Sequence, residues 1–296
     1  MTRVAFLGLG AIGAPIASHL APPSFDLVVW NRTRERAKGF VANHGGHIAD
    51  SPRSAGKNAE FAITCLPSSR EVDQVLFGDD GLAASLASGA ILIDCTSGDP
   101  GASRRIATRL AEQGIDFLDA PVSGGVTGAI AGALTVMCGG DEAVFDRCRP
   151  VLEAFGKKIV RCGGVGAGHA VKAVSNALLA VHIWSLGEAL TALAKLDVNT
   201  AVALDVISAS AGRSNASQNL FPERVMTRAF PRTFRLALLD KDIGIAATLA
   251  EEAGVSVPVI ELTARLIRDA HAELGEEADH VEAVKVIEQR AGVRVS

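Results

Sequence analysis

The sequence lacks the features that mark several other classes of protein. No cluster of Lys and Arg stands out, and the net charge of -4 over 296 residues leaves no basic footprint for a nucleic acid. No uninterrupted apolar run reaches the roughly 18 residues of a membrane span. The N-terminal stretch could be taken for a signal peptide, but Pro15 and the glycine spacing favour a strand, a turn and a helix. We therefore expect a soluble cytoplasmic protein with neither nucleic acid nor membrane as partner.

Cysteine is scarce, and its arrangement indicates no disulfide framework. The number is odd, no CxxC pair occurs, and several cysteines lie in apolar runs. Such residues are typical of small buried thiols in a reducing compartment. We expect no metal site. The five are Cys65, Cys95, Cys138, Cys148 and Cys162.

What is present predicts a two-domain globular protein. Apolar residues make up 48% of the chain and charged residues 21%, which is ample for a sizeable core. Residues 1–162 alternate short apolar runs with helical segments, a pattern typical of βαβ units and a mostly parallel, doubly wound α/β sheet. The predicted strands are 4–9, 25–30, 61–67, 90–96, 117–123, 134–140 and 157–163, with a short extended piece near His47–Ile48.

The pattern becomes almost entirely helical after residue 163. We place the domain boundary there, with residues 1–162 as the cofactor-binding Rossmann domain and 163–296 as an all-α domain for substrate and oligomerisation. A long helix is expected over about 166–195. The polar, irregular stretch from Gly212 to Pro231 could be a binding loop. Turn signals occur at Gly212–Asn215, Pro222, Pro231, Gly254 and Gly275.

A GxGxxG pattern follows the first predicted strand and opens a helix, which is the context a dinucleotide site requires. The first glycine would permit a tight turn, the second would let the backbone approach a pyrophosphate, and the third would let helix and strand pack closely. The helix N-terminus would offer N–H groups to the phosphates. The pattern consists of Gly8, Leu9, Gly10, Ala11, Ile12 and Gly13.

The end of the second predicted strand favours NADP over NAD. An NAD site usually carries Asp or Glu there to accept from the ribose 2′-hydroxyl, whereas this chain has Asn31, Arg32 and Thr33. Arg32 is a planar cation that suits a 2′-phosphate, and Thr33 adds a hydroxyl donor. The alternative is that Arg32 is a solvated surface charge, and NAD stays possible.

Two further stretches could carry substrate chemistry. Ser123, Gly124 and Gly125 could present a hydroxyl and bare N–H groups to a carboxylate, or form a tight structural loop. Lys172 and Asn176 lie four residues apart, on one face of the long helix. They could be a solvated lysine and a packing amide. The glycine-rich helix start at the domain boundary favours a partly desolvated lysine that acts as acid and base.

Four motifs in the same order resemble the β-hydroxyacid dehydrogenase family over essentially the whole chain. GLGAIGAPIASHL (8–20) is similar to its cofactor motif and DAPVSGG (119–125) to its substrate motif. GAGHAVKAVSN (166–176) is similar to its catalytic motif and LDKDIGIA (239–246) to its C-terminal motif. The family includes 3-hydroxyisobutyrate dehydrogenases, tartronate semialdehyde reductases and glyoxylate/succinic semialdehyde reductases.

The resemblance implies roles for individual residues. Lys172 would be the general acid and base, and Asn176 would orient the substrate or the lysine. Lys241 would close the site near cofactor and substrate. The substrate carboxylate would be held by Ser123, Gly124 and Gly125, and the cofactor would be lined by Cys65, Leu66, Pro67, Thr96 and Ser97. This chain has Thr96-Ser97 where Ser-Thr is frequent, so which hydroxyl meets the nicotinamide stays open.

The implied activity is an NADPH-dependent interconversion of a small carboxylate-bearing aldehyde and its hydroxy acid. Alternatives are an enzyme like 6-phosphogluconate dehydrogenase, one like imine reductases, and a non-catalytic NADP-binding sensor. The apolar long helix and the resemblance also imply a homodimer or homotetramer. The arginine-rich segment 212–235 could select a substrate with a second acidic group, or it could be a solvated surface.

Overall fold

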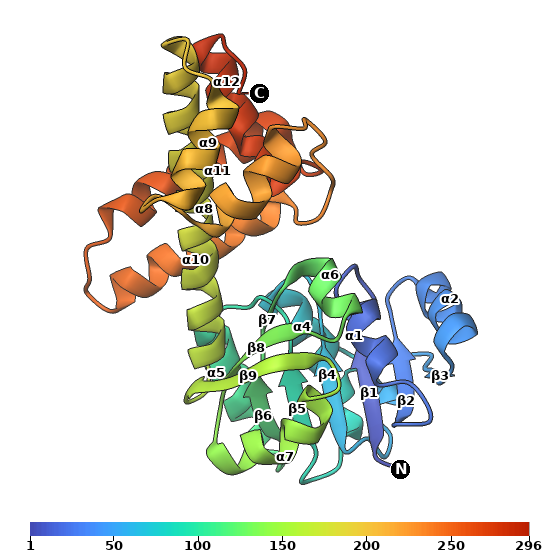
Figure 1. The fold of residues 1–296 in the computed structure, drawn as a ribbon. Coiled ribbons are helices and arrows are strands. Elements are labelled where there is room, and N and C mark those ends of the chain that lie inside the picture. Colours follow the sequence, from blue (N-terminus) through green and yellow to red (C-terminus); the bar gives the residue numbers. More distant parts are fainter. Residues whose placement is uncertain (296) are drawn as a thin grey trace. The chain divides into compact units, whose positions relative to one another are not determined.

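The computed structural model describes residues 1–295, which form two compact units, Met1–Lys172 and Ala173–Ser296 (Figure 1). The division falls inside the long helix α8 (Ala167–Lys195) and not at residue 162, where we placed the boundary. The physical reason is that the start of α8 is hydrogen-bonded to a strand of the first unit: Asp119 accepts from the N–H groups of Gly166 and His169.

The first unit is built on one sheet with the strand order β3-β2-β1-β4-β5-β6-β8-β7, and β9 pairs with β8. The pairs from β3 to β6 are parallel, and the order reverses direction at β1, between β2 and β4. This reversal is the switch point at which doubly wound folds bind dinucleotides. The strands are β1 (Arg3–Leu7), β2 (Asp26–Trp30), β3 (His47–Ile48), β4 (Phe61–Thr64), β5 (Ile91–Asp94), β6 (Asp116–Asp119), β7 (Val122–Ser123), β8 (Leu134–Gly139) and β9 (Gly156–Gly163).

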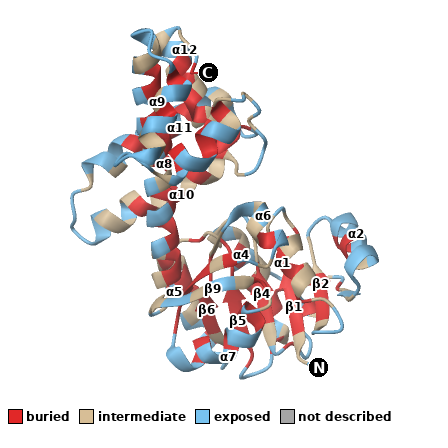
Figure 2. Ribbon diagram, viewed as in Figure 1, coloured by how far each residue is buried: buried red, intermediate tan, exposed pale blue. Residues whose placement is uncertain are grey.

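Helices connect these strands, and the central strands are buried on both faces (Figure 2). Phe6, Ile63 and Ile93 belong to one buried cluster, and Leu7 and Leu92 belong to another, so successive residues of a strand point to opposite faces. The helices of this unit are α1 (Gly13–His19), α2 (Arg34–His44), α3 (Pro52–Ala55), α4 (Ser69–Phe77), η1 (Leu82–Ser85), α5 (Pro100–Ala111), α6 (Gly125–Ile130) and α7 (Glu142–Leu152).

The predicted α/β class and the predicted strands are confirmed, with one correction. The single strand expected over 117–123 is two strands, β6 and β7, which flank Ala120 and Pro121. Proline has no N–H to donate to a ladder, so the chain leaves the sheet there. After it, β8 pairs antiparallel with both β6 and β7.

The second unit is mostly helical over residues 173–295, as predicted, with one isolated bridge between Arg235 and Asp279. Its core gathers around α8, where Ala177, Ala180 and Ile183 are fully buried. By length and composition alone α8 could cross a membrane, and 44% of its most apolar window is buried in the folded chain. The other helices are α9 (Thr200–Ala209), η2 (Ala216–Val225), α10 (Leu236–Glu252), α11 (Pro258–Leu274), η3 (His280–Glu282) and α12 (Ala283–Ala291).

The expectation of an irregular stretch from Gly212 to Pro231 was wrong for its middle, because η2 is a π-helix that spans Ala216–Val225 and contains Pro222, whereas the two flanks are irregular. Proline normally breaks a helix since it donates no hydrogen bond. Here the hydroxyl of Ser208 donates to the Ser217 carbonyl at 2.9 Å, and the N–H of Met226 reaches the Phe221 carbonyl in the wide π pattern.

The arginine-rich segment 212–235 is tied largely to the C-terminal part of its own chain. Arg224 pairs with Asp279, Arg228 forms a bidentate pair with Glu288, and Arg232 pairs with Glu277. Arg213 is exposed. These ion pairs give three of the arginines a structural role, and they weaken the idea that the segment reads a second acidic group on a substrate.

Asp279 supplies a test of this anchoring. Its carboxylate is fully buried and accepts from the backbone N–H groups of Thr233 and Phe234 at 2.8 and 3.0 Å. Burial alone would raise the pKa of Asp279, but the hydrogen bond and charge of His280, with the two N–H donors, hold it well below its ordinary value. The wild-type protein therefore keeps the stability from this carboxylate at neutral pH and loses it as pH falls below about 4.

We expect Asp279→Asn to cost about 3 kcal/mol of unfolding free energy at pH 7, because a buried pair loses one partner. The difference in unfolding free energy between the variant and the wild-type protein should become smaller as pH falls below about 4, since only the Asp279 carboxylate of the wild type takes up a proton. Urea unfolding curves of both proteins at pH 7 and pH 3 measure this. An unchanged gap would show that the charge of Asp279 is not what holds the segment.

Candidate active site

The glycine loop between β1 and α1 has the conformation that the GxGxxG pattern predicts. Gly8 has a φ of +109°, and a side chain there would overlap the Cys65 carbonyl oxygen. A side chain at Gly13 would overlap the Gly8 carbonyl oxygen. A Cβ at Gly10 would meet no protein atom within 4 Å. The loop is thus packed at its two ends and open in the middle, where a pyrophosphate can approach the backbone.

Of the three residues that follow β2, Asn31 holds the glycine loop, and Arg32 and Thr33 face solvent. Asn31 accepts from the Leu9 N–H at 2.9 Å and donates to the Thr33 carbonyl at 2.9 Å, so it fixes the glycine loop against β2. Arg32 and Thr33 are exposed, and Arg32 forms no ion pair within residues 1–295. Of the three predicted cofactor residues, Asn31 supports the loop, and the side chains of Arg32 and Thr33 are open to a ligand.

The loops after β4 and β5 are joined to each other. The buried hydroxyl of Thr96 accepts from the Leu66 N–H at 3.1 Å, while the Thr96 N–H donates to Asp94. Ser97 is half-buried. The Thr96 hydroxyl therefore ties the loop after β5 to the loop after β4. Cys65 and Leu66 are half-buried, and Pro67 is exposed beside them.

The 119–125 segment places a turn of small residues at the edge of the first unit. Ser123 ends β7, and Gly124 and Gly125 follow with φ of +134° and +64°. Both glycines are exposed, and a Cβ at Gly125 would meet nothing within 4 Å. The short helix α6 then lies against α1, where His19 Nε2 is 2.9 Å from the Ala129 carbonyl oxygen. The bare backbone of this turn is therefore accessible.

Asp119, which we did not predict as a site residue, holds the start of α8. Its buried carboxylate accepts from the Gly166 N–H at 2.6 Å and from the His169 N–H at 2.9 Å. Burial raises the pKa of Asp119, although the charge of His169 and the two N–H donors oppose this. A side chain at Gly168 would overlap the Met137 carbonyl oxygen, so the glycine-rich start lets α8 approach the sheet closely.

Lys172 and Asn176 lie one turn apart on α8, and both are buried, at 9% and 6% exposure. In the second unit, Asn176 donates to Asp242 Oδ2 at 2.6 Å, and Lys241 Nζ lies 3.1 Å from Asp242 Oδ1. The structure thus brings Asn176 and Lys241 together on one buried carboxylate. Sequence reasoning missed Asp242, although it is the second letter of the Lys-Asp pair in the C-terminal motif.

The cysteines offer no nucleophile. All five are free thiols, and burial, with the charge of Asp94, raises the pKa of Cys65 to about 12. Burial likewise raises the pKa of Cys138 and of Cys148 to about 12. No group of three or more His, Cys, Asp or Glu side chains within residues 1–295 is arranged to hold a metal ion.

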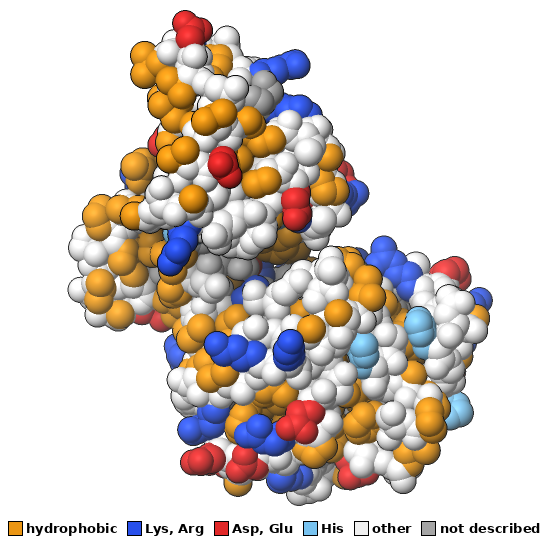
Figure 3. Space-filling view, in the orientation of Figure 1, with side chains coloured by type: hydrophobic (Ala, Val, Ile, Leu, Met, Phe, Trp, Pro, Cys, Tyr) orange, Lys and Arg blue, Asp and Glu red, His pale blue; other side chains and the backbone are white. Residues whose placement is uncertain are grey.

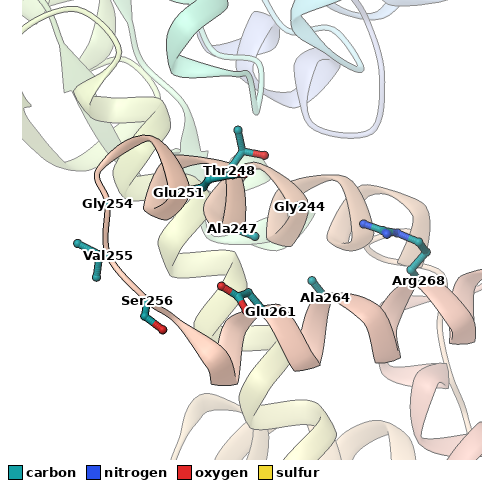
Figure 4. A pocket seen from close by; sticks show the side chains of 10 residues that line it. All are labelled: Gly244, Ala247, Thr248, Glu251, Gly254, Val255, Ser256, Glu261, Ala264 and Arg268. Carbon is teal, nitrogen blue, oxygen red and sulfur yellow. The ribbon is translucent and has the colours of Figure 1, made fainter.

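A pocket of the second unit lies between α10 and α11 and is separate from these residues (Figure 4). It contains none of the side chains that the sequence singled out, and its charged groups are Glu251, Glu261 and Arg268. We assign it no part in the chemistry. Its lining consists of Gly244, Ala247, Thr248, Glu251, Gly254, Val255, Ser256, Glu261, Ala264 and Arg268.

Comparison with known proteins agrees with this geometry. A family model described as the NAD binding domain of 6-phosphogluconate dehydrogenase matches residues 3–164. A second, described as the NAD-binding of NADP-dependent 3-hydroxyisobutyrate dehydrogenase, matches residues 166–287. The glycine loop at the switch point and these matches define an oxidoreductase that uses a nicotinamide dinucleotide.

Individual relatives cover almost the whole chain. The 2-(hydroxymethyl)glutarate dehydrogenase of Eubacterium barkeri is 34% identical over 99% of this chain and 97% of its own. The 3-hydroxyisobutyrate dehydrogenase of Pseudomonas aeruginosa is 36% identical over 95% of each. The structure of a Mycobacterium tuberculosis 3-hydroxyisobutyrate dehydrogenase with L-serine is 32% identical and has a TM-score of 0.89, covering 97% of this chain and 99% of that one. The chain belongs to the β-hydroxyacid dehydrogenase family.

Proposed function

We propose that the protein is an NADPH-dependent oxidoreductase that interconverts a small carboxylate-bearing aldehyde and the corresponding hydroxy acid. Lys172 is its general acid and base. The observation that carries the proposal is the burial of Lys172 on the helix turn that Asp119 fixes to the sheet. Lysine is seldom this buried unless it is paired, and burial can lower the pKa of an amine toward the range in which it transfers protons.

When bound, the reduced dinucleotide would supply the hydride. The protein binds and orients the substrate and supplies the proton. In reduction, Lys172 donates a proton from Nζ to the oxygen that develops negative charge; in oxidation, neutral Lys172 accepts the hydroxyl proton. Ser123, Gly124 and Gly125 bind the substrate carboxylate through the hydroxyl and the backbone N–H groups. Asn176, whose amide is held by Asp242, orients the substrate or the lysine.

The open backbone at Gly10 and the exposed Arg32 and Thr33 fit the cofactor's pyrophosphate and 2′-phosphate.

Cofactor preference has its own test at Arg32. Because the guanidinium is exposed and unpaired within residues 1–295, its removal should leave the fold intact. We expect Arg32→Ala to weaken NADPH by about tenfold, the loss of one charge-assisted phosphate contact, with less than a twofold effect on NADH. Fluorescence titration with both cofactors measures this. Equal weakening of both would show that the 2′-phosphate is not bound there.

The substrate panel tests the activity itself. Purified protein should oxidise or reduce at least one compound of the panel given below with NADP(H) or NAD(H). The absorbance of the reduced nicotinamide measures the reaction. The set combines compounds named for the relatives with small aldehydes: 3-hydroxyisobutyrate, 2-(hydroxymethyl)glutarate, L-serine, glyoxylate, succinic semialdehyde and tartronate semialdehyde. Binding of NADPH without turnover of any of them would favour a non-catalytic sensor.

Two different enzyme activities have less support. An activity like that of 6-phosphogluconate dehydrogenase shares the Lys-x-x-x-Asn spacing, but residues 166–287 match the hydroxyisobutyrate family model. Imine reductases generally replace the lysine that is present here at position 172.

We also propose that the protein acts in the cytoplasm as a homodimer or homotetramer. Apolar side chains gather on the visible surface of the second unit over α8 and α9 (Figure 3). Leu178, Val202 and Val206 are among those about half exposed. Contiguous exposed apolar side chains of this kind favour a protein interface.

A further inference from the structure

His169 lies at the centre of a buried hydrogen-bond network in the first unit. Its side chain is fully buried, with Nε2 2.8 Å from the Thr96 carbonyl oxygen and Nδ1 2.6 Å from the Ser103 hydroxyl. Because a carbonyl oxygen can only accept, Nε2 carries a hydrogen and donates it to Thr96. Asp94 Oδ2 lies 3.9 Å from the same nitrogen.

The loop after β5 wraps around this imidazole ring. A Cβ at Gly98 would lie 2.8 Å from His169 Cε1, so the loop backbone lies directly on the ring. The Ser103 hydroxyl also lies 3.0 Å from the Asp99 carbonyl oxygen. The segment from Thr96 to Asp99, which includes Ser97, is therefore packed against the His169 ring at Gly98 and hydrogen-bonded to it at Thr96.

The same residue holds the helix turn that carries Lys172. The His169 N–H donates to Asp119, and Lys172 follows three residues later on α8. The Thr96 hydroxyl extends the connection to the loop after β4 through the Leu66 N–H. The His169 side chain thus joins the lysine-bearing turn directly to the loop after β5, and through Thr96 to the loop after β4; we expect both loops to line the cofactor.

We propose that His169 is a positioning residue for hydride transfer, which sets the place of Lys172 relative to the Thr96–Ser97 loop through its bond to the Thr96 carbonyl. The proposal rests on the proposed function, because it assumes that Lys172 transfers the proton. Misplacement of a catalytic group by about 1 Å can cost up to a hundredfold in rate, so the effect should be much larger in kcat than in cofactor affinity.

A matched pair of variants tests this. His169→Gln keeps an amide donor that can reach Thr96, and His169→Met has a similar length and no donor. With the panel compound that wild type turns over fastest, we expect the glutamine variant to keep kcat within about threefold and the methionine variant to lose about tenfold or more. Both should bind NADPH with a Kd within about threefold of wild type, because the glycine loop carries the pyrophosphate contact. Equal kcat values for the two variants would overturn the proposal.

Two more variants test the proposal if the methionine variant does not fold, and separate a failure of the positioning role from a failure of the proposed function. If the methionine variant does not fold, Gly98→Ala, whose methyl group would crowd both the Ser69 hydroxyl and the His169 ring, should lower kcat by about tenfold while the NADPH Kd changes by less than about threefold; unchanged kcat would overturn the proposal. Lys172→Ala is assayed in parallel. If it retains turnover, the proposed acid–base function is wrong and the positioning role with it. If it is inactive while the two His169 variants are alike, only the positioning role is wrong.

Discussion

Lys172→Ala should lower kcat by at least about a hundredfold while NADPH binds as tightly as to the wild-type protein. The reason is that proton transfer by a positioned side chain contributes about 10²–10⁴-fold, whereas in the proposed function the glycine loop and Arg32 hold the dinucleotide. Truncation of a side chain that is only 9% exposed removes the amine without adding bulk. Steady-state turnover and a fluorescence titration with NADPH separate the two quantities.

Two control variants sharpen this result. Lys172→Arg keeps the positive charge, but a guanidinium does not release its proton near neutral pH, so it should be about as inactive as the alanine variant. Lys195→Ala, at the exposed far end of the same helix, should keep wild-type turnover. Normal turnover by the arginine variant would mean that Lys172 acts through its charge and not by proton transfer.

Gly10→Ala and Gly13→Ala should fail in different ways, although they change the same loop. A methyl group at Gly13 would overlap the Gly8 carbonyl oxygen, so we expect a loss of about 2–3 kcal/mol in unfolding free energy, the scale of overpacking. A methyl group at Gly10 meets no protein atom within 4 Å. It should leave stability unchanged and weaken NADPH by about tenfold or more, because the backbone can no longer approach the pyrophosphate closely.

Thermal unfolding without ligand and NADPH titration of both variants measure this difference. The pair is its own control, since each variant adds one methyl group to the same loop. Normal NADPH affinity in Gly10→Ala would contradict the placement of the pyrophosphate at this loop.

Much of the fold could be predicted because its signals are local. Apolar runs such as 61–67 and 90–96 contain the strands β4 and β5 because both faces of the sheet are covered. The glycine spacing of 8–13 follows from close contacts at the β1-α1 turn. The prediction of an irregular stretch around Pro222 failed because the rule that proline breaks a helix does not hold there. Pro222 signalled a turn, but a hydroxyl from Ser208 replaces the hydrogen bond that proline cannot make, and a helix results.

The site was predictable in its residue types and not in its support. The sequence alone determined the strand-helix alternation, the glycine loop, and the spacing of Lys172 and Asn176, because these depend on residues a few positions apart. Only the tertiary structure decided what holds them. Asp119 meets Gly166 across 47 positions, Asn176 meets Asp242 across 66, and His169 meets Thr96 across 73. No periodicity encodes such pairs, since they form only when the sheet and the helices pack.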